Sequence, residues 1–270
     1  MTGPTSDPFM PLQLSTGERL WIPADLHLLL PASASVGPEL LHYLAYIPWD
    51  PGYLERVDPV YRDFFSLVLP YLHVRTTDVH VATCLPYAQE LIGDHPGPVD
   101  ERVVHVAFIL HDSGWSQMTE TEIAASLGVS GLALSGEAVA PKARHVELGR
   151  DLAERLLSEY AFDPPLTAEQ TEMIYTAILY HDRPEELVAM GGVPASIQVV
   201  CDTDHLWSFT HENFWQDTVR KGVDPRAYVE NLRRDLDGYF VTDAGKRRAA
   251  LMLEERRVEV DSWREWVGSS

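Results

Sequence analysis

Apolar residues recur at helical spacing along most of the chain, and residues 103–115 show this pattern most clearly. The positions seven, four and three residues before His111 are all apolar. In a helix with 3.6 residues per turn these positions share one face with His111, which should therefore point towards the interior. Gly114 follows the His111-Asp112 pair closely and interrupts the pattern. We therefore predict a short buried helix that ends in an inward-facing histidine and an adjacent aspartate.

The same spacing precedes two other polar residues. Apolar side chains lie seven, four and three residues before both His181 and Asp204. Asp202 lacks such a stripe, so periodicity favours Asp204 as the buried carboxylate, although the string DTDH leaves Asp202 as the alternative. His80 and His145 also share the apolar faces of helical patterns. The pattern thus places polar side chains on the inner faces of several helices.

Helical patterns account for most of the central part of the chain. One helix should begin near Thr77 or Asp78, because both residue types are good N-caps. Residues 142–160 form another predicted helix, and Thr167 with Gln170 forms a capping box that begins the next. Since nearly every segment has helical spacing, we predict an all-α fold, a helical bundle.

The flanking segments have weaker patterns. Residues 1–37 are rich in proline, serine and glycine, which predicts an irregular arm with at most one short strand or helix. Two short helices are expected within residues 38–72. The polar stretch 116–142 contains one short helical pattern and indicates a lid or binding loop, with a disordered insertion as the alternative. The charged tail over residues 209–266 predicts an outer layer of helices.

Composition narrows the possible environments and partners. The 270 residues include 41 acidic and 21 basic side chains, for a net charge of -20. Such a charge disfavours binding to nucleic acid or to an anionic membrane surface, but local cations could still hold a small anionic substrate. Two cysteines, Cys84 and Cys201, suit a reducing compartment. With no signal-peptide pattern and no apolar run of about 20 residues, we expect a cytoplasmic protein.

The inward-facing polar residues come from different predicted helices, which favours a shared partner over separate packing roles. They are His80, His111, Asp112, His145, His181 and Asp204. Buried carboxylates are costly without a cation, and no lysine or arginine lies on these faces. A divalent transition metal, one or two ions of Fe, Mn, Co, Ni or Zn, would supply that cation. A structural network of hydrogen-bonded histidines is the alternative.

The order H…HD…H…H…D on a helical scaffold resembles the HD-domain superfamily of metal-dependent phosphohydrolases. The resemblance rests on the strings HVATCLPYA from His80, ILHDSGW around His111, HVELGRDLAERL from His145, AILYHD around His181 and VVCDTDHL around Asp204. It covers residues 73–210. The resemblance therefore implies an HD-like metal-binding domain there, with an N-terminal arm and short helices over 1–72 and a helical extension over 211–270.

The resemblance also implies which residues hold metal. The four-ligand core carries over as His80, His111, Asp112 and Asp204. His145 and His181 match the positions that hold a second metal in the dinuclear branches of the superfamily. The string after Asp112 departs from the family at Gly114-Trp115, where a small or basic residue is more usual.

The function implied by the resemblance is hydrolysis of a small phosphate ester or nucleotide by metal-activated water, with Asp112 and His145 in catalytic roles. Lys142, Arg144, Arg183 and also Arg75 are expected as cations for the substrate phosphate, with ordinary surface charges as the alternative. Two other functions remain open. One is a mixed-valent di-iron oxygenase that cleaves a C–C or C–P bond with O₂, and the other is a metal-bound or degenerate protein for ligand sensing or assembly.

Overall fold

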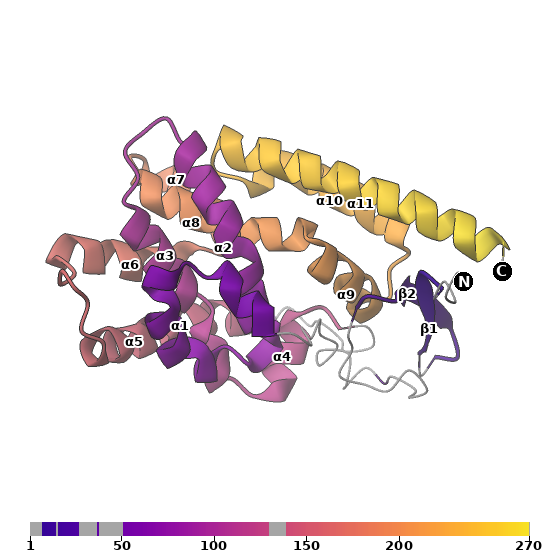
Figure 1. Ribbon diagram of the computed structural model, residues 1–270, viewed down its shortest axis with the longest axis horizontal. Helices are drawn as coiled ribbons and strands as arrows, with labels where there is room; N and C mark the ends of the chain where they lie inside the picture. The colour runs from indigo at the N-terminus through magenta and orange to yellow at the C-terminus, as the bar shows by residue number, and fades with distance from the viewer. Residues whose placement is uncertain (1–6, 15, 27–36, 38–50, 130–138, 270) are drawn as a thin grey trace, which may run out of the picture.

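The chain folds as a predominantly α-helical protein. The computed structural model describes residues 7–14, 16–26, 37, 51–129 and 139–269. These residues form eleven α-helices and a two-stranded sheet, which confirms the predicted all-α class (Figure 1). The helix predicted at 38–47 lies outside the described residues, as do positions 130–138 of the predicted lid. None of the described helices combines the length and apolar content that crossing a bilayer requires.

The innermost element is α3 (Glu101–Leu110), which is buried continuously from Val103 to its last residue. It packs against α6 and α8, while α2 packs on α3 and α8, and α5 packs on α6. The bounds of these four helices are Thr77–Asp94 for α2, Val139–Glu159 for α5, Ala168–Tyr180 for α6 and Ala195–Leu206 for α8. The apolar stripes that predict these helices therefore meet in one core.

The N-terminal ends of two helices test the N-caps that were predicted from the sequence. The predicted capping box is present, because Thr167 Oγ1 accepts from the backbone N–H of Gln170 and Gln170 Oε1 accepts from that of Thr167. The predicted cap of α2 is wrong by one residue. Its N-cap is Thr76, which has φ 63° and makes no side-chain cap, and Thr77 Oγ1 donates to the carbonyl of Val74 instead.

The N-terminal arm is more regular than predicted. Strands β1 (Phe9–Gln13) and β2 (Arg19–Pro23) pair antiparallel. Leu12 and Ile22 are buried in a small cluster with Val219, a residue far along the chain. The hairpin thus gains its apolar partner from a distant helix, which local composition could not reveal.

Shorter elements connect the arm to the core. The second of the two predicted N-terminal helices is present as α1 (Arg62–Val68), but single turns of 3-10 helix flank it. The short helix predicted in the lid-like stretch is α4 (Glu120–Ser126). The remaining short elements are η2 (Pro51–Arg56), η3 (Pro59–Tyr61), η4 (Leu69–Tyr71), η5 (Val74–Thr76), η6 (Ser113–Gln117), α7 (Pro184–Met190) and η8 (Trp207–Phe209).

The C-terminal part is helical, as predicted, but it is not an outer layer throughout. Helices α10 (Pro225–Tyr239) and α11 (Asp243–Ser269) lie side by side along one flank of the molecule (Figure 1). Helix α9 (His211–Lys221) is different, because every residue from Asn213 to Arg220 is buried. This helix sits between the core and the N-terminal hairpin and brings polar side chains inside.

Candidate metal centre

Two histidines project from the ends of core helices in the same way. His111 follows the last residue of α3, and its Nδ1 lies 2.6 Å from the carbonyl oxygen of Phe108. His181 follows α6, and its Nδ1 lies 2.8 Å from the carbonyl oxygen of Ile178. A carbonyl oxygen only accepts, so each Nδ1 donates and satisfies a backbone group that the helix end leaves open. Nε2 of each ring is thereby directed into the cluster, where an unprotonated Nε2 offers its lone pair to a cation.

Asp112 lies between two groups of histidines. Its Oδ2 is 3.6 Å from His80 Nδ1 and 3.7 Å from His111 Nε2. Its Oδ1 is 3.5 Å from Nε2 of both His145 and His181. The two oxygens of this carboxylate thus face different histidines, and ligand atoms of His111, His181 and Asp204 also lie within 4.8 Å of one another. A carboxylate so placed could contact one ion or two.

Asp204, and not Asp202, reaches this cluster. Asp204 Oδ1 lies 3.4 Å from His80 Nε2 and 3.2 Å from His111 Nε2. Asp202 is fully buried elsewhere, where it accepts hydrogen bonds from the backbone N–H groups of Val241 and Thr242 at 2.6 and 3.0 Å. The apolar stripe before Asp204 therefore indicated the correct side chain, and Asp202 instead fastens the start of α11.

The donor set fits a metal ion. Nε2 of His80 and Nε2 of His111 are buried without a hydrogen-bond partner in the described structure, and both lie close to Asp204 Oδ1. Potential ligand atoms lie within 4.8 Å of one another in several groups, among them His80 with His111 and Asp112, and Asp112 with His145 and His181. Buried nitrogen lone pairs beside carboxylates are costly alone, and one or two divalent cations would satisfy them. The cluster therefore has the composition and spacing of a metal site.

Protonation states agree with this assignment for most of the ligands. Burial raises the pKa of Asp112, but the charge of His111 and hydrogen bonds from His145 and His181 outweigh it and hold the pKa well below its usual range. Burial also raises the pKa of Asp204, but the hydrogen bond from His111 and the charges of His111 and His181 outweigh it and lower the pKa overall. Burial lowers the pKa of His80 and His145. Ionised carboxylates and neutral imidazoles are the forms that bind metal.

His181 differs from the other histidines. Burial lowers its pKa, but the hydrogen bond to Asp112 and the charges of Asp182 and Asp204 raise it overall to about 9. At neutral pH this ring carries a proton that a metal ion must displace. Metal binding at this side of Asp112 should therefore release a proton.

Trp115, immediately after the His111-Asp112 turn, supports two ligands. Its ring stacks on His145 at a centroid distance of 4.0 Å, and its Nε1–H donates to Asp112 Oδ1 at 2.9 Å. Gly114 allows this approach, because a Cβ there would lie 2.0 Å from the carbonyl oxygen of His145. Gly114 and Trp115 thus hold α5 against the turn that follows His111 and Asp112.

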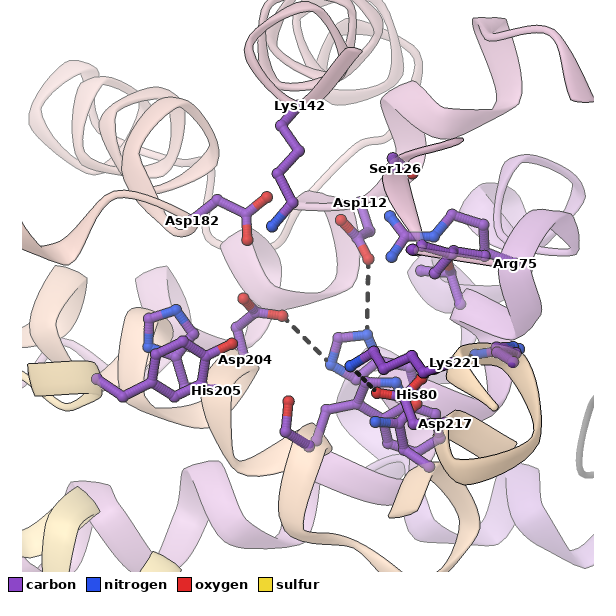
Figure 2. A pocket seen from close by; sticks show the side chains of 18 residues that line it. Arg75, His80, Asp112, Ser126, Lys142, Asp182, Asp204, His205, Asp217 and Lys221 are labelled. Carbon is purple, nitrogen blue, oxygen red and sulfur yellow. Dashed lines mark hydrogen bonds and ion pairs between the residues drawn. The ribbon is translucent and has the colours of Figure 1, made fainter. Parts of the chain in front are cut away.

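The cluster opens into a pocket of about 260 Å³. Lys142 extends into it between Asp182 and Asp112 (Figure 2). Arg75 also lines the pocket, whereas Arg144 and Arg183 are not among its lining residues. Arg144 pairs instead with Glu122 at 2.6 Å, and Arg183 bonds to Glu186 and stacks on Tyr180. Two of the four cations expected from sequence therefore reach the pocket.

Sequence reasoning missed the pocket residues contributed by the C-terminal part. They are Asn213, Asp217, Arg220 and Lys221 of α9 and Tyr239 of α10. One signal was available, because Phe214 and Trp215 are adjacent and point about 100° apart on a helix. Two large apolar side chains so placed indicate a helix buried on more than one side, unlike a member of an outer layer.

Comparison with known proteins adds no relative to this picture: no family model, no curated protein and no solved structure matches the chain. The fold and the cluster define the class as an all-α protein with a buried histidine–aspartate site that could hold metal.

Proposed function

We propose that the chain is a metal-dependent phosphohydrolase that acts on a small phosphate ester, as its resemblance to the HD-domain superfamily implies. The observation that carries the proposal is the position of Asp112, whose two oxygens face different histidines at the base of a pocket that Lys142 and Arg75 also line. Phosphoryl transfer needs mainly positioning and electrostatic stabilisation, and this arrangement is suited to both.

The ligands would divide between two ions. His80, His111, Asp204 and Oδ2 of Asp112 would hold one, and His145, His181 and Oδ1 of Asp112 would hold the other. Bound divalent ions supply Lewis-acid chemistry, because they lower the pKa of a water molecule and neutralise charge on phosphoryl oxygens. Trp115 would keep Asp112 and His145 oriented through its hydrogen bond and its stacked ring.

Other side chains of the pocket would position water and phosphate. Asp182 Oδ2 lies 3.7 Å from His145 Nε2, and the side chain remains 24% exposed towards the pocket. Burial raises the pKa of Asp182, but His181 and Lys142 lower it overall. Because Asp182 is ionised, it is suited to accept a hydrogen bond from the attacking water. The ammonium group of Lys142 would bind a phosphoryl oxygen across the same space.

Elemental analysis of protein purified without chelators, combined with visible absorption under air and an assay on phosphate monoesters, tests the proposal. We expect a colourless protein with one or two divalent ions that hydrolyses such esters. His111→Ala should lose metal and activity, whereas His73→Ala should retain both, because the His73 side chain is 60% exposed outside the cluster.

Other results would assign another function. Two irons per chain, a mixed-valence spectrum and O₂ uptake without ester hydrolysis would identify the di-iron oxygenase. A protein that neither contains metal nor takes it up would contradict both enzymes. Metal binding without either activity would indicate the sensing or assembly protein.

A further inference from the structure

The pocket has two halves of opposite charge. One half includes and adjoins the candidate metal ligands, which we call the ligand cluster. It has three carboxylates, Asp112, Asp182 and Asp204, and one cation, Lys142. The other half has Arg75, Arg220 and Lys221 with a single carboxylate, Asp217. In Figure 2, Arg75 and Lys221 lie on the opposite side of the pocket from Asp182. We call the second group, Arg75, Arg220, Lys221 and Asp217, the cationic half.

Arg75 is held in this half by an unusual backbone. Both Arg75 and Thr76 adopt left-handed conformations, with φ 60° and 63°, which are unfavourable for side chains with a Cβ. The Arg75 guanidinium lies 4.0 Å from the ring centre of Trp115, and its Nε is buried without a hydrogen-bond partner. Within the described residues no carboxylate pairs with Arg75. Strain that positions a cation without an anionic partner points to a ligand.

The neighbouring cations share one carboxylate that is already well bonded. Asp217 Oδ2 accepts from Lys221 Nζ at 2.7 Å and from the Tyr228 hydroxyl at 2.6 Å, and Asp217 Oδ1 lies 3.8 Å from Arg220. Arg220 is only 2% exposed, and both burial and the charge of Arg75 lower its pKa, to about 10. Arg220 also donates to Gln216 Oε1 at 2.8 Å, but that amide is uncharged. An anion bound between Arg75 and Arg220 would therefore offset the repulsion between their two charges.

We propose that the cationic half binds a second anionic group, a phosphate or carboxylate, of the substrate whose phosphate ester lies at the metal centre. The substrate assignment rests on the proposed function. Both halves belong to one cavity of about 260 Å³, below the typical ~300–1,000 Å³ of ligand pockets, so the two anions must be joined by a short chain. Because the whole chain carries a charge of -20, these local cations have to offset repulsion of such a ligand.

The first test measures anion binding without metal. Chelator-treated protein is titrated with inorganic phosphate by calorimetry, and its folding is confirmed by thermal unfolding. We expect binding that is about tenfold weaker in Arg75→Gln and in Lys221→Gln, since each loses a charged hydrogen-bond donor. Arg150→Gln is the matched control, because Arg150 pairs with Asp151 and Glu154 on the surface. Absence of phosphate binding by the wild type, or binding by the two pocket variants that is as tight as that of the wild type, would overturn the proposal.

The second test compares substrates of the metal-loaded protein: glycerol 3-phosphate, 3-phosphoglycerate and 1,3-propanediol bisphosphate. The wild type should have a higher kcat/KM for a substrate with a second anionic group than for glycerol 3-phosphate. Comparison of 3-phosphoglycerate with 1,3-propanediol bisphosphate then distinguishes a carboxylate from a phosphate as that second group. Arg75→Gln should remove this preference through KM. If no ester is hydrolysed although phosphate binding depends on Arg75, the proposed function fails and the anion site stands. If esters are hydrolysed without preference in every variant, the anion site fails alone.

Discussion

The two halves of the pocket are built in different ways. The ligand cluster comes from helices of the central bundle, where His111 and His181 each follow an apolar helix and bond to its last turn. The cationic half comes from a strained turn at Arg75 and from α9, which is remote in sequence. Regular helical periodicity therefore indicated the candidate metal ligands, while packing between distant segments supplied the groups that would select a substrate.

The largest expected effect comes from the residue shared by the two ligand groups. Asp112→Asn keeps the shape of the side chain but removes the charge that both groups face. We expect loss of bound metal and a fall in activity of more than about a hundredfold, beyond the usual effect of a residue that only orients a ligand. Elemental analysis and kcat provide the readout, with Asp151→Asn on the surface of α5 as control. Full metal content in Asp112→Asn would refute the bridging role.

Two substitutions in α8 would distinguish a residue that holds metal from one that only stabilises the fold. Asp204→Asn should lose metal and remain folded, because Asp204 faces His80 and His111. Asp202→Asn should retain metal but lower the free energy of unfolding by about 1–3 kcal/mol, since Asp202 accepts buried hydrogen bonds at the start of α11. Chemical denaturation and metal analysis of both variants measure the difference. The reverse pattern would make Asp202 the ligand.

Trp115 lies between the two halves and contacts both. Trp115→Phe retains an aromatic ring against His145 and Arg75 but removes the donor to Asp112 Oδ1. We expect metal affinity to fall about 10–100-fold, as for other partners of metal ligands. Competition with a chelator of known affinity would measure the change. An unchanged affinity would show that the stacked ring alone holds the site.

The smallest expected effect is the change in metal affinity with each pH unit, which depends on the proton of His181. Its pKa is about 9 in the folded metal-free protein, above about 6.5 in an unfolded chain. Metal must displace this proton, so affinity should rise about tenfold per pH unit between 7 and 9 and level off above. The protonated ring also stabilises the metal-free fold, fully below pH ~6.5, and this contribution is lost as the pH rises through 9. Titrations at several pH values, compared with His181→Asn, should show a steeper dependence in the wild type.

The local sequence was sufficient to predict the helices of the core and the side chains that form the ligand cluster. The apolar stripes before His111, His181 and Asp204 placed these residues inward, and the structure brings their ligand atoms together. The capping box at Thr167 and Gln170 also follows from sequence, because it depends on residues three positions apart. Periodicity succeeds here because one turn of helix fixes which side chains share a face.

Only the tertiary structure decided which cations face the pocket. Lys142 and Arg144 are two residues apart, yet Lys142 enters the pocket and Arg144 pairs with Glu122 of α4. The burial of Arg220 likewise depends on how α9 packs between distant segments. Helical spacing determines relative directions within one helix, whereas the direction that faces the ligand is determined by contacts between segments far apart in the chain.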